Sequence, residues 1–390
     1  MKVIGLSYIT LLIYPIIAAI LLFGFKKAKK GEFNEEWNSF SQTKAIQGLM
    51  ALCIVCHHTA QQTCVNWLPS GNIVNGLNVF SDTGFLFVGV FFFWSGYGLF
   101  KSFKSKQKYL SGFISKRVVP VLVPYVIVCF LFTLERIFVF KEKMPLWFKI
   151  TNFTGITIGY YFGWYIQAIV VFYLVFYFAF KYSRYDFDAI LYVFAGVLLW
   201  VVAGLIIDHN DYFMRGQWWY NSTMLFPFGV LFAKNESKII EFLKKRFIIL
   251  VPSSIILFFL SFFFSRFMES IGGYYGEMMG FPFSKKILYR VLTLTPQLLA
   301  AAMFTLILLL ICMKAKFHNK VLDFLGSHTL EIYLTHAFFL EFFAISYNYK
   351  RDSIFYARPW LLLLVTIILT IPAAVLLKKE CNLLCKKPVR

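Results

Sequence analysis

The sequence contains few charged residues, and acidic residues are the scarcer kind. Only 15% of its 390 residues are charged, and 19 Asp and Glu stand against 39 Lys and Arg. Hydrophobic residues make up 59% of the chain, and its mean hydropathy is +0.68. A soluble domain of this length could not bury so much apolar surface. The composition therefore excludes an ordinary soluble protein and indicates one that lipid covers.

The net charge of +20 does not indicate a protein that binds nucleic acid. Proteins of that class carry their cations on one face of a soluble fold. Here the cations lie in short segments between apolar runs, as expected at the edges of a membrane. We expect membrane lipids and no nucleic acid among the partners.

The seven cysteines do not form the spacing pattern of a disulfide framework. Cys53, Cys56, Cys129 and Cys312 lie inside apolar runs, where cysteine usually serves as a small hydrophobic residue. Cys53 and Cys56 form a C-x-x-C pair, but no histidine follows at the spacing of a zinc site. The sequence therefore predicts packing roles for these cysteines and no metal site.

Long apolar runs dominate the chain. A hydrocarbon core of about 30 Å needs about 20 apolar residues in a helix that rises 1.5 Å per residue. By this measure we expect an all-α fold, a polytopic transmembrane helical bundle of about eleven spans. The predicted spans are 3–25, 45–62, 83–100, 118–139, 157–180, 188–207, 219–233, 247–265, 291–313, 323–344 and 359–377.

The distribution of Lys and Arg predicts the orientation of these spans. One set of alternate loops holds about twice as many cations as the other, and positive charge is retained on the cytoplasmic side. The C-terminus is therefore predicted in the cytoplasm and the N-terminus outside the cell membrane. The first run is predicted to be a retained helix, because its basic cluster follows it and a signal peptide carries its charge before the run.

The second predicted span carries the strongest functional candidates. An ionisable side chain inside a bilayer is costly unless it faces protein or water. At 100° per residue, Gln47 and His58 lie about 20° apart on one helical face, and Lys44 lies within about 40° of it. His57 points about 100° away. A pair of histidines here could act in catalysis, or could simply satisfy hydrogen bonds at the membrane interface.

Other polar residues also interrupt or flank the spans. Ser95 and Tyr97 close the third span, where small residues permit close helix packing. The loop that ends in Lys116 and Arg117 could attract a phosphorylated molecule, or serve only topology and anionic lipid.

The tenth span carries Glu331 and His336, which must both avoid lipid. They could serve chemistry or form a hydrogen-bonded pair between helices.

Taken in order, several of these segments resemble the membrane-bound acyltransferase 3 family, which includes bacterial O-acetyltransferases of surface polysaccharides. Gln47 stands where the family usually has Arg, eleven residues before the histidine. The resemblance implies an extra N-terminal helix and loop over 1–39, a ten-helix acyltransferase core over 40–378 and a basic tail over 379–390. The matching segments are Lys44 to His58, Gly84 to Tyr97, Lys116 to Pro120, Trp164 to Gln167, Phe226 to Gly229 and Leu325 to His336.

The resemblance also implies an activity, the transfer of an acyl group, taken as acetyl, from cytoplasmic acyl-CoA to a hydroxyl of a cell-surface or lipid-linked carbohydrate. In this hypothesis acetyl-CoA is the co-substrate, no metal takes part, and His58 or His57 acts as general base or briefly carries the acyl group. The expected residues are, for catalysis, His58, His57, Lys44 and Gln47; for the coenzyme, Lys116, Arg117, Ser95 and Tyr97; and for the acceptor, Trp164, Glu331 and His336.

Two other functions remain open from the sequence. A transporter or flippase of lipid-linked saccharides would also place polar residues in a helical bundle, although no pair of matching half-repeats is visible. The second alternative is an accessory membrane protein without catalytic activity, which the Gln47 in place of Arg favours.

Overall fold

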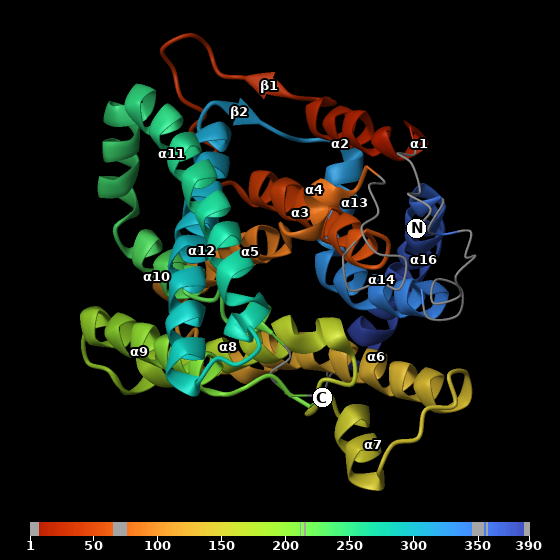
Figure 1. Ribbon diagram of the computed structural model, residues 1–390. Coiled ribbons are helices and arrows are strands. Elements are labelled where there is room, and N and C mark those ends of the chain that lie inside the picture. The colour runs from red at the N-terminus through yellow and green to blue at the C-terminus, as the bar shows by residue number, and fades with distance from the viewer. Residues whose placement is uncertain are drawn as a thin grey trace.

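A computed structural model describes residues 8–64, 76–210, 212–213, 216–344, 355 and 358–385. These residues form helices joined by short connections, with one two-stranded ribbon (Figure 1). The elements are α1 (Tyr8–Leu11), α2 (Ile13–Leu22), β1 (Lys26–Lys27), α3 (Phe40–Gln61), α4 (Asn78–Ser81), α5 (Gly84–Ser105), a π-helical turn (Ile114–Val118), α6 (Val119–Phe138), α7 (Leu146–Phe153), α8 (Trp164–Tyr182), α9 (Asp186–Ile206), α10 (Leu225–Lys234), α11 (Glu236–Gly272), α12 (Phe283–Cys312), β2 (Ala315–Lys316), α13 (Lys320–Ser327), α14 (Thr329–Phe343) and α16 (Pro359–Cys385).

Seven helices of the described chain are long and apolar enough to cross a membrane. They are α5, α6 with the π-helical turn before it, α8, α9, α11 with the 3₁₀ turn that follows it (Tyr274–Gly276), α12 and α16. The fold is therefore a helical, multi-pass membrane protein. The count of eleven spans, the orientation of the termini and the domain limits at residues 39 and 378 stay predictions.

The four remaining predicted spans also coincide with helices, but with shorter or more polar ones. The first is divided into α1 and α2, with its residues 3–7 outside the described part of the chain, and the seventh is reduced to the ten residues of α10. The tenth is divided at His328 into α13 and α14. The second is the full-length helix α3, which begins where the Ser39 side chain accepts a hydrogen bond from the Gln42 N–H. Its polar residues lower its hydropathy, and most of its side chains are buried against protein.

Glycines at two helix crossings decide how the central helices pack. A Cβ on Gly96 of α5 would lie 2.1 Å from the Phe226 carbonyl oxygen of α10, and one on Gly229 of α10 would lie 2.1 Å from that of Phe93. At the second crossing, a Cβ on Gly326 of α13 would lie 2.2 Å from the Lys44 carbonyl oxygen of α3. Backbones can approach this closely only where a side chain is missing. These glycines thus fix α5 against α10 and α3 against α13.

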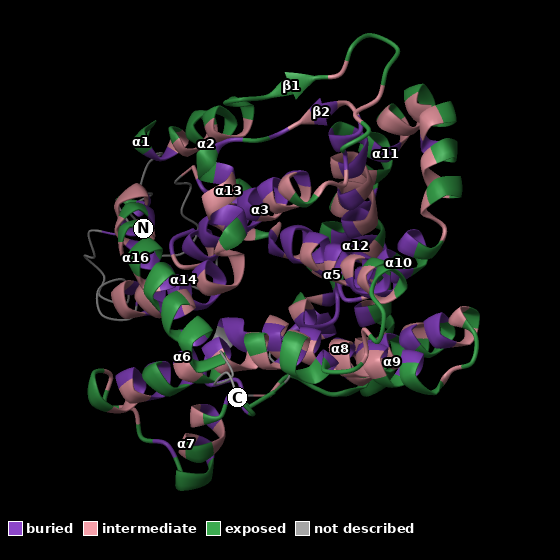
Figure 2. Cartoon of the chain, turned by 180° about the vertical axis from the view of Figure 1, so that it is seen from behind, coloured by how far each residue is buried: buried purple, intermediate pink, exposed green. Residues whose placement is uncertain are grey.

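Burial separates an inner group of helices from an outer one. Buried residues concentrate on α3, α5, α10 and α14, while α9 and α11 carry long exposed faces (Figure 2). The exposed residues of α11 are chiefly Ile, Leu and Phe, such as Ile256, Leu260 and Phe263. Such a face fits contact with lipid. The inner helices are therefore the ones that can enclose a site.

The chain before α3 is tied to the segment after α12. Strand β1 pairs antiparallel with β2, with Lys26 opposite Lys316. The Asn34 side chain donates hydrogen bonds to the carbonyl oxygens of Cys312, at 2.9 Å, and Ala315, at 3.1 Å.

All seven cysteines are free, and six of them are buried, which agrees with the packing roles expected from the sequence.

Candidate functional site

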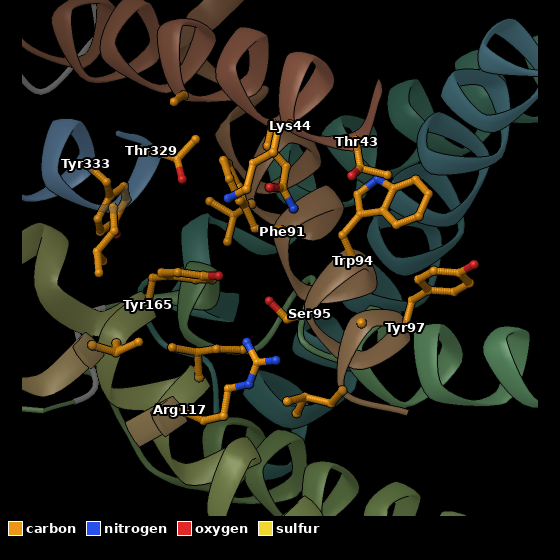
Figure 3. Close-up of a pocket in the computed structure, with 18 of the residues that line it drawn as sticks. Thr43, Lys44, Phe91, Trp94, Ser95, Tyr97, Arg117, Tyr165, Thr329 and Tyr333 are labelled. Carbon is orange, nitrogen blue, oxygen red and sulfur yellow. The ribbon is translucent and has the colours of Figure 1, made fainter. Parts of the chain in front are cut away.

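Helices α3, α5, α6, α8 and α14 line a cavity of about 570 Å³. This volume lies in the range of small-molecule and cofactor sites. Figure 3 shows Lys44 and Arg117 on opposite sides of the cavity, with Ser95 and Tyr165 between them. The main lining residues are Asn38, Thr43, Lys44, Gln47, Ala51 and Ile54 from α3 and its approach, Val88, Phe91, Trp94, Ser95, Tyr97, Lys101 and Ser102 from α5, Arg117 and Val121 near the start of α6, Tyr165, Ile166, Ile169 and Tyr173 from α8, and Thr329, Leu330 and Tyr333 from α14.

One stripe of α3 leads along the cavity towards its histidine. Lys44, Gln47, Ala51 and Ile54 line the wall at steps of three and four residues, so they share one helical face. His58 is the next residue on that face and lies about 6 Å beyond Ile54 along the axis. The cavity therefore has a cationic end near Lys44 and an imidazole one turn beyond its opposite end, about 21 Å from Lys44.

His58 is held by a second histidine from α14. The Nδ1 atom of His58 lies 2.7 Å from Nε2 of His336, and both residues are buried. Nδ1 of His336 lies 2.9 Å from the Ile332 carbonyl oxygen, which can only accept. With both rings neutral, His336 donates from Nδ1 to Ile332 and accepts at Nε2 from His58. This tautomer leaves the lone pair of His58 on Nε2, the state that a general base requires.

An aromatic side chain covers the other face of His58. The ring centroid of Phe162 lies 3.9 Å from that of His58, and the hydroxyl of Tyr333 donates to the Phe162 carbonyl oxygen. Tyr333 also lines the cavity. The imidazole is therefore fixed by packing as well as by its hydrogen bond.

His57 occupies a different environment from its neighbour. Its Nδ1 lies 2.6 Å from the Phe80 carbonyl oxygen and must donate to it. A Cβ on Gly84 would lie 2.3 Å from the Nε2 atom of His57, so the ring fills the space that this glycine leaves. His57 does not line the cavity. The geometry thus gives the two histidines different partners, and helical phase along α3 had already favoured His58.

The cations of the cavity differ in how far they are neutralised. Lys101 forms an ion pair of 2.7 Å with Glu236, and Glu236 also accepts from the Tyr97 hydroxyl at 2.8 Å. Arg117 donates to the hydroxyl oxygens of Tyr109, at 2.9 Å, and Ser102, at 3.4 Å. Within the described part of the chain, Arg117 and Lys44 form no ion pair with a carboxylate. These two cations are the ones best able to attract an anionic ligand.

The structure brings together some of the residues expected from the sequence and separates others. Lys44, Gln47, Ser95, Tyr97 and Arg117 line one cavity, and His58 and His336 form a pair one turn beyond it. Lys116, Trp164 and Glu331 do not line this cavity. Lys116 is exposed in the π-helical turn, and Trp164 packs on Trp218 with ring centroids 5.4 Å apart.

Lys101, Tyr165, Phe162 and Tyr333 belong to this region but were not among the site residues expected from the sequence, although Tyr165 and Tyr333 fall in segments that resemble the family. Lys101 could have been found, because it lies on the same side of α5 as Trp94 and Gly98, which also line the cavity. Phe162 carried no signal, since it lies in a connection whose position depends on α14.

Fold and site together define a multi-pass membrane protein with a cation-lined cavity between its helices and a buried histidine pair near one end. The model of the acyltransferase 3 family, described as an acyltransferase domain, matches residues 43–379. The chain therefore belongs to the acyltransferase 3 family and is a membrane acyltransferase. Searches of curated proteins and of solved structures each gave no significant match.

Proposed function

We propose that this acyltransferase takes an acetyl group from acyl-CoA and transfers it to a hydroxyl of a cell-surface or lipid-linked carbohydrate. The observation that carries the proposal is the His58–His336 pair at 2.7 Å, one turn beyond the end of a cavity lined by Lys44 and Arg117. A base held in one tautomer and a nearby cationic cavity are the two parts that acyl transfer from a phosphorylated donor needs.

The lining of the cavity supports acyl-CoA as the donor. Arg117 and Lys44 would attract the phosphates, because neither forms an ion pair with a carboxylate among the described residues. The wall between them and His58 is largely apolar, with Ala51, Ile54 and Ile166. A wall of this kind fits a short uncharged acyl group better than a charged one, since Ala51, Ile54 and Ile166 offer nothing that could pair with a carboxylate.

The proposed reaction needs no group beyond these side chains and the two substrates. Nε2 of His58 takes the proton of the acceptor hydroxyl as the hydroxyl oxygen bonds to the thioester carbonyl carbon. The carbon–sulfur bond then breaks, and the imidazolium returns the proton to the leaving sulfur. His336 orients the ring through Nδ1 and stabilises its charged form during the reaction.

The proposal also includes the identity of the acceptor and the side of the membrane from which each substrate approaches. The family resemblance favours a carbohydrate acceptor, and the distribution of Lys and Arg favours a cytoplasmic donor. Because His58 lies about 21 Å along α3 from Lys44, donor and acceptor would approach the histidine from opposite ends.

The test is release of CoA from acetyl-CoA by detergent-purified protein, followed by chromatography, with membrane glycan extract as acceptor. We expect release that depends on the extract, and a fall of roughly 10³-fold or more in His58→Ala. His318→Ala is the matched control, because His318 lies in the connection before α13 and outside the cavity. Full activity of His58→Ala would overturn the role of His58, and absence of acetyl-CoA binding by the wild type would overturn the donor.

A further inference from the structure

Helix α2 lies outside the residues that the family model matches, yet it contacts the region of the histidines. The Tyr14 hydroxyl donates to the Gly76 carbonyl oxygen at 2.7 Å. The Tyr14 ring stacks on Phe80 of α4, with centroids 5.8 Å apart and planes 14° apart. Since the match begins at residue 43, nothing in the family assignment gives this contact a role.

Phe80 connects Tyr14 to α3. Its ring packs on Tyr14, and its carbonyl oxygen accepts the hydrogen bond of 2.6 Å from Nδ1 of His57. The position of that carbonyl therefore depends on how α4 is seated against α2. Short helices such as α4, with four residues, have little stability of their own and depend on packing.

His57 in turn fixes the C-terminal end of α3. Its ring lies between the Phe80 carbonyl and Gly84, where an added Cβ would lie 2.3 Å from the ring. The His57 and His58 ring centroids are 5.0 Å apart, and consecutive helical residues turn together. Any rotation of this helix end that releases His57 would also turn His58 away from His336.

We propose that Tyr14 and His57 are positioning residues for the base His58, acting through Phe80. Tyr14 seats α4, the Phe80 carbonyl then holds His57, and His57 sets the rotation of α3 that directs Nδ1 of His58 at His336. The inference rests on the proposed function, because it assigns a role relative to His58. Helix α2 thus helps to position the catalytic base without contacting the substrates.

The first test compares His57→Phe with His57→Asn. Phe cannot donate to the Phe80 carbonyl, whereas the Asn amide can. We expect kcat to fall by roughly tenfold or more in His57→Phe, because a small misplacement of a catalytic group is costly. The KM for acetyl-CoA should stay within about twofold, since the cations of the cavity are not altered. His57→Asn should recover most of the lost kcat.

Two further variants change the surroundings of His57, one at Gly84 beside its ring and one at Tyr14 behind Phe80. Gly84→Ala forces the ring to move and should resemble His57→Phe, and Tyr14→Leu should lower kcat in the same direction by a smaller factor. Tyr185→Leu is the control for Tyr14→Leu, because Tyr185 is exposed and lies before α9. Wild-type kcat in folded His57→Phe and Gly84→Ala would overturn the proposal. So would His57→Asn as slow as His57→Phe, because His57 would then be needed for its own proton transfer.

A readout without turnover separates this inference from the proposed function. The chain has six histidines, so their imidazole ¹⁵N signals can be assigned by single replacements. Positioning predicts that His57→Phe shifts the His58 signals and that His57→Asn leaves them in place. If the wild type shows no acyl transfer, the proposed function fails, but the spectrum still tests whether His57 positions His58. Unchanged His58 signals in His57→Phe would overturn the positioning role.

Discussion

His58 and His336 come from helices far apart in the chain, yet their imidazole planes are nearly parallel, 2° apart, with ring centroids at 5.0 Å. The bond of 2.7 Å between Nδ1 of His58 and Nε2 of His336 joins them edge to edge. Because the Ile332 carbonyl determines the proton on His336, the backbone of α14 indirectly determines the proton on His58.

This relationship predicts that His336 matters through its lone pair. His336→Phe removes the acceptor for His58 and should lower kcat by about 10²-fold, with little change in the KM for acetyl-CoA. His336→Gln offers a carbonyl oxygen as acceptor and should retain more activity than His336→Phe. Steady-state kinetics of CoA release would measure both. Equal activity of the two variants would contradict the role of the hydrogen bond.

A second prediction concerns the cations. Arg117→Gln should raise the KM for acetyl-CoA by roughly tenfold to a hundredfold, because a hydrogen bond to a charged group contributes about 1.5–3 kcal/mol. Lys116→Gln should leave that KM nearly unchanged, since Lys116 is exposed and does not line the cavity. Equal increases in both variants would instead support the pair expected from the sequence.

A third prediction concerns the crossing of α5 and α10. Gly96→Ala places a Cβ 2.1 Å from the Phe226 carbonyl oxygen and should lower the free energy of unfolding by about 1–3 kcal/mol. Gly98→Ala, two residues further along the same helix, places its Cβ more than 4 Å from every atom outside the adjacent backbone of α5 and should not destabilise the protein. Thermal unfolding in detergent would compare them, and equal midpoints would contradict the close packing.

A fourth prediction concerns acid. The Arg290 guanidinium of α12 donates to Asp208 at 2.5 Å, and this hydrogen bond lowers the pKa of the Asp208 carboxyl below its ordinary value. A lowered folded-state pKa stabilises the protein above the ordinary pKa of about 3.9, and this contribution is lost as the pH falls through the folded pKa. Asp208→Asn should therefore be less stable than wild type at pH 7.

The stability difference between the wild type and Asp208→Asn should depend on pH. It should be constant above about pH 5 and shrink on further acidification, because the wild-type carboxyl then also becomes neutral. Unfolding midpoints of both proteins at pH 7, 5 and 3.5 would measure it. A difference that grows on acidification would contradict the assignment.

Helical phase along α3 allowed much of the candidate site to be predicted. The stripe from Lys44 through Gln47 to His58 was visible because residues at steps of three and four share a face whatever surrounds them. The apolar runs likewise located the helices, since the length of a span depends on the thickness of a bilayer. The family resemblance added the class of reaction, which the family model then confirmed.

Contacts between distant segments were decided only by tertiary structure. Helical phase favoured His58 over His57, but the sequence could not show that the Phe80 carbonyl lies beside His57 and His336 beside His58. It likewise grouped Lys116 with Arg117 as neighbours, although only Arg117 turns into the cavity. Periodicity along a helix is a local property that the sequence carries by itself, whereas the partner that a side chain meets depends on how helices cross, and here glycines at the crossings set that distance.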